Sequence, residues 1–262
     1  MLEVSRFWRD SALPFVEARV VGDGRQVCHA AHSHESFSLG VITGGRSTYV
    51  SGHDQFEVAA GSTVLINPGV IHACNPVSGL PWSYIMLFID TPWLASVGLT
   101  LPSQRYSAAP GLYQQVLSVC AALFDPDAAD REQRLRAMLC DLPRFLGQEP
   151  ASEDGINPRL EAAAAFIRAH RSDPLTLEDI ATACGLSRAY LIRAFGKRFG
   201  LTPHGYLLDQ RVQLARSHLR HGQSIAEAAQ SAGFADQSHL QRAFKRHLAA
   251  TPGHYRQTTA FR

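Results

Sequence analysis

Two stretches near the end of the chain decide the fold: residues 176–206 read TLEDIATACGLSRAYLIRAFGKRFGLTPHGY, and residues 224–255 read SIAEAAQSAGFADQSHLQRAFKRHLAATPGHY. Four residues align at an offset of 48: Leu177, Ile180, Ala181 and Gly185 with Ile225, Ala228, Ala229 and Gly233. With one extra residue after that glycine, three more align: Phe195, Pro203 and Tyr206 with Phe244, Pro252 and Tyr255. Ordered matches of this kind indicate a structural unit that occurs twice.

Each unit is predicted to be a helix, a tight turn and a second helix. In the first unit, Thr176 caps a helix that ends at Gly185, and Ser187 caps the next helix. The same places in the second unit are held by Ser224, Gly233 and Asp236. Two short helices joined by a glycine turn form the helix-turn-helix, whose second helix can enter the major groove of DNA.

The outer faces of the two second helices carry groups that can bind DNA. Polar side chains hydrogen-bond to base edges, and Arg and Lys neutralise phosphates. The candidate DNA-binding residues are Arg188, Ala189, Tyr190, Ile192, Arg193 and Lys197 in the first unit and Gln237, Ser238, His239, Arg242, Lys245 and Arg246 in the second. One longer helix, residues 206–221, joins the units and is expected to hold them about one turn of DNA, roughly 10 bp, apart. One alternative is that these are solvated faces of an ordinary helical bundle, which the duplication in a basic domain disfavours. Another is a protein-binding helical module whose basic face never touches DNA.

Net charge divides the chain into two parts. Residues 1–150 carry 10 basic and 14 acidic side chains, a net charge of −4, whereas residues 151–262 carry 15 and 9, a net charge of +6. The basic part suits contact with a polyanion. Residues 148–157 are rich in Gly, Pro, Ser and acid, without hydrophobic period, which predicts a linker. The expected domains are therefore residues 1–147 and residues 158–262.

The duplicated region resembles a known family. Residues 158–257 are similar to the DNA-binding domain of the AraC/XylS family of bacterial transcription regulators, in which one long helix joins two helix-turn-helix units. The resemblance rests on motifs in both units: Gly185-Leu186-Ser187, Phe195-Gly196-Lys197, Pro203 with Tyr206, Gly233-Phe234, Phe244-Lys245 and Pro252 with Tyr255-Arg256.

This resemblance implies roles for individual side chains. The base-facing positions it implies are Ala189, Ile192 and Arg193 in the first unit and Gln237, Ser238, His239 and Arg242 in the second. Ala189 and Ile192 depart from the polar base readers that are frequent in the family, so Arg193 is expected to carry most of the first unit's discrimination. Arg188 and Tyr190 are expected nearer the DNA backbone.

The acidic part is predicted to be a small β structure. Five segments read as short strands between Gly, Asn and Pro turns: 26–32, 36–43, 47–52, 62–66 and 82–89. His32 and His34, the Pro68-Gly69 turn and His72 resemble features of the cupin barrel found at the N-terminus of many AraC-family members. The predicted fold class is therefore α+β: a small cupin-like β-barrel with two following helices, then an all-α double helix-turn-helix domain.

A barrel of this kind can hold one small ligand in a cavity lined by alternate strand residues. The candidates for effector contact combine apolar walls with a few polar anchors. They are His34, Phe37, Arg46, Tyr49, His72, Trp82 and Tyr84.

His32, His34 and His72 are also of the residue type that binds zinc, iron, nickel or copper. Enzymatic cupins add a glutamate a few residues after the H-x-H motif, and residues 37–39 of this chain read FSL at that place. The missing carboxylate favours a ligand pocket or hydrogen-bonded barrel histidines. We therefore expect no metal, no cofactor and no catalytic residue, with a metal-dependent cupin enzyme carrying an accessory DNA-binding domain as the alternative.

Two amphipathic helices are expected after the strands. One has an apolar stripe at Leu112, Val116, Val119 and Leu123, and the other, interrupted by Pro143, at Leu135, Met138, Leu139, Leu142 and Leu146. Periodicity favours packing of both stripes on the barrel, whereas the family resemblance favours pairing with a second chain in a homodimer.

The sequence thus predicts a sequence-specific transcription regulator, not an enzyme, that binds double-stranded promoter DNA and responds to a small-molecule effector in its N-terminal barrel. Contact with RNA polymerase is a further expectation. The sequence does not separate activation from repression, and activation is the working assignment. The chain shows neither a run of about 20 apolar residues nor a secretory start, so we expect a cytoplasmic protein with no membrane partner.

Overall fold

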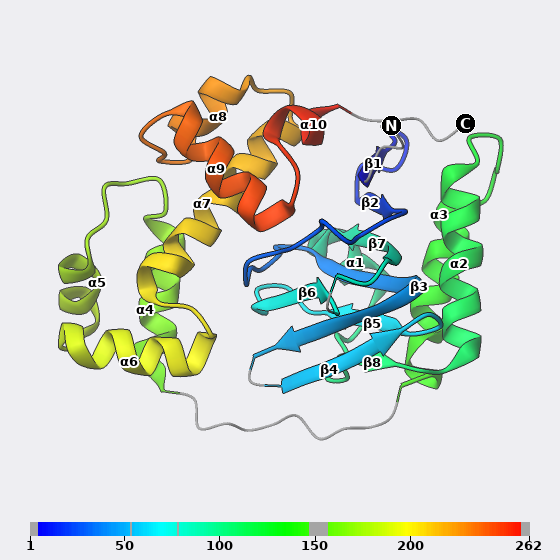
Figure 1. Ribbon diagram of the computed structural model, residues 1–262, viewed down its shortest axis with the longest axis horizontal. Helices are drawn as coiled ribbons and strands as arrows, with labels where there is room; N and C mark the ends of the chain where they lie inside the picture. Colours follow the sequence, from blue (N-terminus) through cyan, green and yellow to red (C-terminus); the bar gives the residue numbers. More distant parts are fainter. Residues whose placement is uncertain (1–4, 53, 78, 147–156, 258–262) are drawn as a thin grey trace.

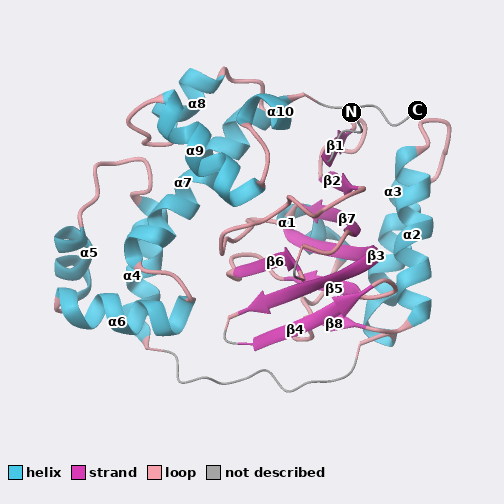
Figure 2. Ribbon diagram, in the orientation of Figure 1, coloured by secondary structure: helices cyan, strands magenta, loops and turns pink. Residues whose placement is uncertain are grey.

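The computed structural model describes residues 5–52, 54–77, 79–146 and 157–257. They form a β-sheet domain followed by an all-helical domain that lies against it (Figure 1). The succession of a sheet domain and a helical domain confirms the predicted α+β fold class (Figure 2). The expected linker lies outside the described residues except for Asn157, which caps the first helix of the second domain.

Eight antiparallel strands make up the described part of the sheet domain. Their bounds are β1 Ser5–Arg9, β2 Val16–Val21, β3 Phe37–Ser51, β4 Asp54–Ala59, β5 Thr63–Ile66, β6 His72–Pro76, β7 Trp82–Ile89 and β8 Tyr106–Ser107. The hydrogen-bonded order is β1-β2-β7-β3-β5-β8, and β4 and β6 both pair with the second half of β3. The strands therefore form a bent, open sheet of cupin-like character rather than a closed barrel.

Strand β3 replaces two strands that the sequence predicts separately, 36–43 and 47–52. The intervening glycines do not make a turn, because the pairing with β7 shifts register between Ile42 and Gly44 and then continues. At Gly45 the φ angle is 70°, and a β-carbon there would lie 2.0 Å from the carbonyl oxygen of Pro81. A bulge of this kind bends a strand, so the two halves of β3 pair with different neighbours.

Residues 26–32, also predicted as a strand, form a loop. Only His32 pairs with another strand position, through an isolated bridge to His72. Farther back in the loop, the backbone N–H of Ala30 donates to the carbonyl of Arg246, 3.0 Å away in the helical domain. One backbone hydrogen bond of this loop therefore crosses to the helical domain, a contact that the local sequence pattern does not reveal.

Among the described residues, three helices accompany the sheet: α1 Thr91–Val97, α2 Pro110–Phe124 and α3 Arg131–Asp141, the last followed by a short 3-10 turn at Leu142–Arg144. Both predicted apolar stripes face the sheet, since Leu112, Val116 and Leu139 are fully buried in one cluster with Phe37 and Leu87. The interpretation from periodicity is the one that the packing follows.

The helical domain contains α4 Pro158–Ala169, α5 Leu177–Cys184, α6 Arg188–Phe199, α7 Pro203–Arg220, α8 Ile225–Ser231, α9 Gln237–Leu248 and α10 Pro252–Arg256. Thr176 and Ser224 each close a capping box with the residue three positions on, Asp179 and Glu227. The two units have separate cores, one around Phe195 and one around the equivalent Phe244. Helix α7 contributes to both cores and joins the units, as the sequence predicts.

None of the helices among the described residues has the length and apolar character needed to cross a membrane.

The duplicated glycines provide a test of the turns. Gly185 and Gly233 both have positive φ, 63° and 75°, but a β-carbon on Gly185 meets open space, whereas one on Gly233 would lie 2.6 Å from the carbonyl oxygen of Ser172. We expect Gly185→Ala to lower the free energy of unfolding by about 1 kcal/mol through backbone strain, and Gly233→Ala to lower it by at least about 2 kcal/mol because strain and collision add. Urea denaturation of both variants measures the difference, and equal losses would contradict the close approach at Gly233.

Candidate functional site

The two predicted recognition helices, α6 and α9, expose the faces that the sequence assigns to DNA. Their inward residues Leu191 and Phe195, and Leu240 and Phe244, are fully buried, as predicted. Eleven of the twelve candidates are exposed, and His239 is half-buried with its ring edge-on to Phe234. Ile192 is 45% exposed and Tyr190 38% exposed on this face, so α6 presents apolar as well as basic side chains to solvent.

Some of these side chains already have intramolecular partners. Arg188 forms an exposed ion pair with Glu178 at 3.2 Å, and the Tyr190 hydroxyl accepts a hydrogen bond from Asn157 Nδ2 at 3.1 Å. Both contacts lie at the edge of α6, where they hold two side chains expected near the DNA backbone.

A buried junction holds the helical domain against the sheet. The carboxylate of Glu17 on β2 accepts from Arg216 of α7 at 2.5 Å, from Arg9 of β1 at 2.6 Å and from the Tyr255 hydroxyl of α10 at 2.8 Å. Burial raises the pKa of Glu17, but the charges of Arg216 and Arg9 outweigh this effect and lower it to about 2. The Glu17 carboxylate is therefore ionised, and its negative charge is the counter-charge for the guanidinium groups of Arg216 and Arg9.

Further along α7, a second set of contacts reinforces the junction. The Ser33 hydroxyl donates to Asp209 at 2.5 Å, and the Ser33 backbone N–H donates to the same carboxylate at 3.1 Å. Arg220 pairs with Asp90 at 3.1 Å. Helix α7 thus contacts the sheet domain at successive turns, including the loop that carries the candidate histidines.

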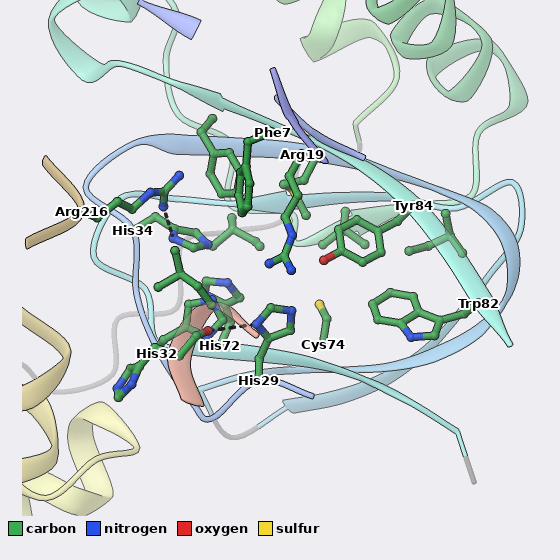
Figure 3. Close-up of a pocket in the computed structure, with 17 residues that line it drawn as sticks. Phe7, Arg19, His29, His32, His34, His72, Cys74, Trp82, Tyr84 and Arg216 are labelled. Carbon is green, nitrogen blue, oxygen red and sulfur yellow. Dashed lines mark hydrogen bonds between the residues drawn. The ribbon is translucent and has the colours of Figure 1, made fainter. Parts of the chain in front are cut away.

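A cavity of about 50 Å³ lies between the sheet and the helical domain. The sheet domain lines it with apolar and aromatic side chains and with His29, His32, His34 and His72 (Figure 3). The helical domain contributes Arg216 from α7 and His247 and Leu248 from the last turn of α9. A molecule in this cavity would therefore touch both domains at once.

The histidines of the cavity are close together and buried. The ring centroids of His32, His34 and His72 lie 4.5–4.8 Å apart, and each residue is 3–6% exposed. Burial lowers the pKa of all three, to about 4 for His72, and the neighbouring histidines lower those of His32 and His34 further. The three imidazoles are therefore neutral near pH 7.

Arg19, on β2, faces the cavity with an incompletely hydrogen-bonded guanidinium group. It is 4% exposed, its Nε donates to the Ser5 hydroxyl at 2.9 Å, and its Nη2 has no hydrogen-bond partner among the described residues. Figure 3 shows the guanidinium pointing into the cavity between His34 and Tyr84. Burial lowers the pKa of Arg19, and the charge of Arg216 lowers it further, although the charge of Glu17 opposes this effect. A buried cation of this kind is costly unless an anion joins it.

Comparison with known proteins decides the family. A family model of the AraC-like ligand binding domain matches residues 16–139, and a family model of a helix-turn-helix domain matches residues 180–258. The chain belongs to the AraC family of transcription regulators. It is accordingly a DNA-binding transcription regulator with an N-terminal ligand-binding domain, and the duplicated units are its helix-turn-helix elements.

Individual relatives agree with this assignment. YbfI of Bacillus subtilis, an uncharacterised HTH-type transcriptional regulator, is 27% identical over 227 residues, 80% of each chain. The HTH-type transcriptional activator RhaS of Klebsiella pneumoniae is 25% identical over 244 residues, 86% of this chain and 87% of RhaS. The crystal structure of unsaturated fatty acid bound ToxT from Vibrio cholerae shares the fold over 96% of this chain and 93% of that one, with a TM-score of 0.59 and 14% identity.

The structure brings together four of the seven residues expected to contact an effector in this AraC-family chain. His34, His72, Trp82 and Tyr84 line the cavity. The other three lie elsewhere. Phe37 packs in the core beneath α2. Tyr49 is buried, and its hydroxyl donates a hydrogen bond to the carbonyl of Leu65. Arg46 lies on the surface in an ion pair with Glu57.

Four polar cavity residues escape the sequence analysis: Arg19, His29, Arg216 and His247. Residues 16–21 read VEARVV, so a glutamate and an arginine inside an otherwise apolar strand are the signal that was available for Arg19. Arg216 and His247 belong to the domain that the sequence assigns to DNA alone, and only the docking of the domains places them here.

The neutral histidines predict a loss of stability in acid. His72 has a folded pKa of about 4 against an ordinary 6.5, so the unfolded chain takes up a proton between these values while the folded chain does not. The stability is fully present above pH 6.5 and is lost as the pH falls towards 4, at about 1.4 kcal/mol per pH unit for such a ring. Urea denaturation across this range should show a shallower slope for His72→Gln than for the exposed control His204→Gln. Equal slopes would contradict a neutral buried ring.

Proposed function

We propose that this AraC-family regulator reads promoter DNA with α6 and α9, and that a small anionic effector bound in the interdomain cavity changes its DNA occupancy. The observation that carries the second part is the composition of the cavity wall. Arg216 of α7 and His247 of α9 line the same space as the sheet residues, so the effector would contact the helix that joins the two units and one of the recognition helices directly.

The reading roles follow the exposed faces. In α6, Arg193 makes the discriminating base contact, Ala189 and Ile192 touch thymine methyl groups, and Arg188, Tyr190 and Lys197 lie near the backbone. In α9, the base-reading residues are Gln237, Ser238, His239 and Arg242, and the phosphate contacts are Lys245 and Arg246. Exposure of both faces beside the buried cores supports these roles.

The effector is a short carboxylate. Its anionic group pairs with the unpartnered Nη2 of Arg19, and its apolar part packs against Trp82 and Tyr84. A cavity of about 50 Å³ fits a group of a few heavy atoms. That ToxT, with the same fold, has been crystallised with an unsaturated fatty acid supports a carboxylate as the class of ligand.

The effector acts on the contact between the domains. A ligand shifts an equilibrium only by its differential affinity for the two states, and an anion between Arg19 and Arg216 favours the docked state because α7 supplies part of the site. Docking restrains α7 and α9, so occupancy of the cavity changes how the two recognition helices are presented to DNA.

Regulation rather than catalysis is the proposed role of the whole chain, with activation as its direction, supported by the activator RhaS. We also propose contact with RNA polymerase and a homodimer. Because the apolar stripes of α2 and α3 are buried against the sheet, with Tyr113 and Leu117 half-buried beside them, the dimer would use the outward faces of these two helices.

Alanine variants in the recognition helices test the reading roles. Arg193→Ala and Arg242→Ala should each cost about 1–3 kcal/mol of binding and relax sequence preference at one position, because a bidentate base contact is lost. Lys245→Ala should weaken binding evenly across sequences and reduce the salt dependence, because it removes a phosphate contact. Selection from a random DNA pool followed by titration at several salt concentrations measures both, with the surface variant Arg46→Ala as the control. Unchanged preference in both arginine variants would remove these two residues from base reading.

The effector class is tested with a panel of short carboxylates and the matching alcohols. A carboxylate that binds should raise the melting temperature of the wild-type protein and alter its affinity for selected DNA. The Arg19→Gln variant should show neither change, because the cationic partner of the carboxylate is gone. Arg46→Gln, in the same domain but on the surface, should respond like the wild type. A full response in Arg19→Gln would exclude the proposed anchor.

A further inference from the structure

The cavity contains a second arrangement that the effector proposal does not use: three imidazoles that converge. One ring nitrogen from each of His32, His34 and His72 can be chosen so that all three lie within 4.8 Å of one another, and all three side chains are buried. Donor atoms this close surround a point that one ion could bind with modest side-chain adjustment.

The backbone builds this cluster and holds it in place. His32 and His72 pair in an isolated bridge, with the His32 N–H donating to the His72 carbonyl at 3.0 Å and the His72 N–H donating to the His32 carbonyl at 2.8 Å. His34 follows two residues later and returns its ring to the same side (Figure 3). The donors are therefore positioned before any ligand binds.

Hydrogen bonds fix which nitrogen is free on two of the rings. Nδ1 of His32 lies 2.8 Å from the Ala30 carbonyl, and Nδ1 of His72 lies 3.0 Å from the Val70 carbonyl. A carbonyl only accepts, so each Nδ1 carries the proton and each Nε2 presents its lone pair. Orientation of a histidine by a backbone carbonyl on its second nitrogen is the arrangement that metal-ligating histidines use.

The Nδ1 atom of His34 accepts a hydrogen bond, whereas those of His32 and His72 donate one. It lies 3.3 Å from Arg216 Nη1, and because a guanidinium only donates, Nδ1 of His34 accepts. A metal on Nδ1 would take the lone pair that Arg216 uses, and a metal on Nε2 of the neutral ring would leave Nδ1 protonated and unable to accept. In either case the ion and the hydrogen bond from Arg216 exclude each other.

We propose that His32, His34 and His72 bind a divalent transition-metal ion, for which zinc is the reference, and that binding releases Arg216 from His34. Three imidazole ligands suit zinc, cobalt, nickel and copper, and they leave coordination positions for solvent or an anion. The glutamate whose absence disfavours this site in the sequence is not needed for a three-histidine site. Because Arg216 belongs to α7, the ion acts on the contact that docks the DNA-binding domain.

Metal binding is tested on the full chain after treatment with EDTA and gel filtration. Calorimetric titration with Zn²⁺ should give one ion per chain, and Co²⁺ should give visible absorption bands of nitrogen coordination. His72→Ala should weaken binding by at least about tenfold, whereas the exposed control His204→Ala should not. If His72→Ala does not fold by circular dichroism, His34→Gln takes its place. Absence of binding, or equal weakening in the control, would overturn the site.

The release of Arg216 is tested separately. Arg216→Met should bind Zn²⁺ about fivefold or more tightly than the wild type, because the competing donor and its charge are gone. Arg220→Met, on the same helix but paired with Asp90, should bind Zn²⁺ like the wild type. In the wild-type protein, Zn²⁺ should also increase hydrogen exchange along α7. Unchanged affinity in Arg216→Met together with unchanged exchange would overturn the coupling. Neither experiment uses DNA or an effector, so both can fail or succeed independently of the proposed function.

Discussion

One buried carboxylate, that of Glu17, holds the two domains in their observed relation. It is 1% exposed and accepts hydrogen bonds from Arg9, Arg216 and Tyr255, which belong to β1, α7 and α10. Without it, two guanidinium groups would be buried with no counter-ion at this point, a change that typically costs about 3–5 kcal/mol. Since both cations keep the pKa of Glu17 at about 2, the junction retains its charge throughout the physiological range.

The position of the cavity follows from this junction. Docking of α7 at Arg216 brings the last turn of α9 over the sheet, so that His247 and Leu248 close a space the sheet domain leaves open. The backbone confirms the same contact, because Ala30 donates to the carbonyl of Arg246 and His29 Nδ1 contacts that of His247 at 2.9 Å. Communication between cavity and DNA would therefore need no extended pathway through α9, because His247 of the cavity wall lies on the same helix as the candidate base-reading residues Gln237 and Arg242.

The sequence predicts the helical domain closely and the cavity only in part, for physical reasons. The helical domain is predictable from local signals, namely helix caps, glycine turns and the equivalent positions of Phe195 and Phe244. Each of these signals occurs in both copies of the duplicated unit. Local reasoning fails at β3, because Gly44 and Gly45 predict a turn but instead pair with Ser83 and Trp82 of β7, just after the register shift that follows Ile42. Arg46 and Tyr49 lie three positions apart, so alternation along the strand places them on opposite faces, and neither side chain lines the cavity. Arg216 and His247 could not be found from sequence at all, since nothing local to them indicates the surface on which they dock.

The charges that line the cavity determine whether a bound ligand would favour or oppose docking of the helical domain. Arg216 is paired with Glu17, whereas Nη2 of Arg19 has no hydrogen-bond partner among the described residues. The space between the two guanidinium groups would therefore favour an anion, and α7 must be in place for Arg216 to take part. A metal ion at the histidines adds positive charge beside Arg216 and withdraws the acceptor that Arg216 uses on His34. A bound anion would therefore favour docking, and a bound cation would oppose it. If the carboxylate effector occupied an open coordination position of the metal, both ligands would bind at one site. The negative charge of the carboxylate would then offset the repulsion between the metal ion and Arg216 of α7. The opposed signs follow from the placement of two arginines and one glutamate, and they do not depend on which carboxylate or which metal binds.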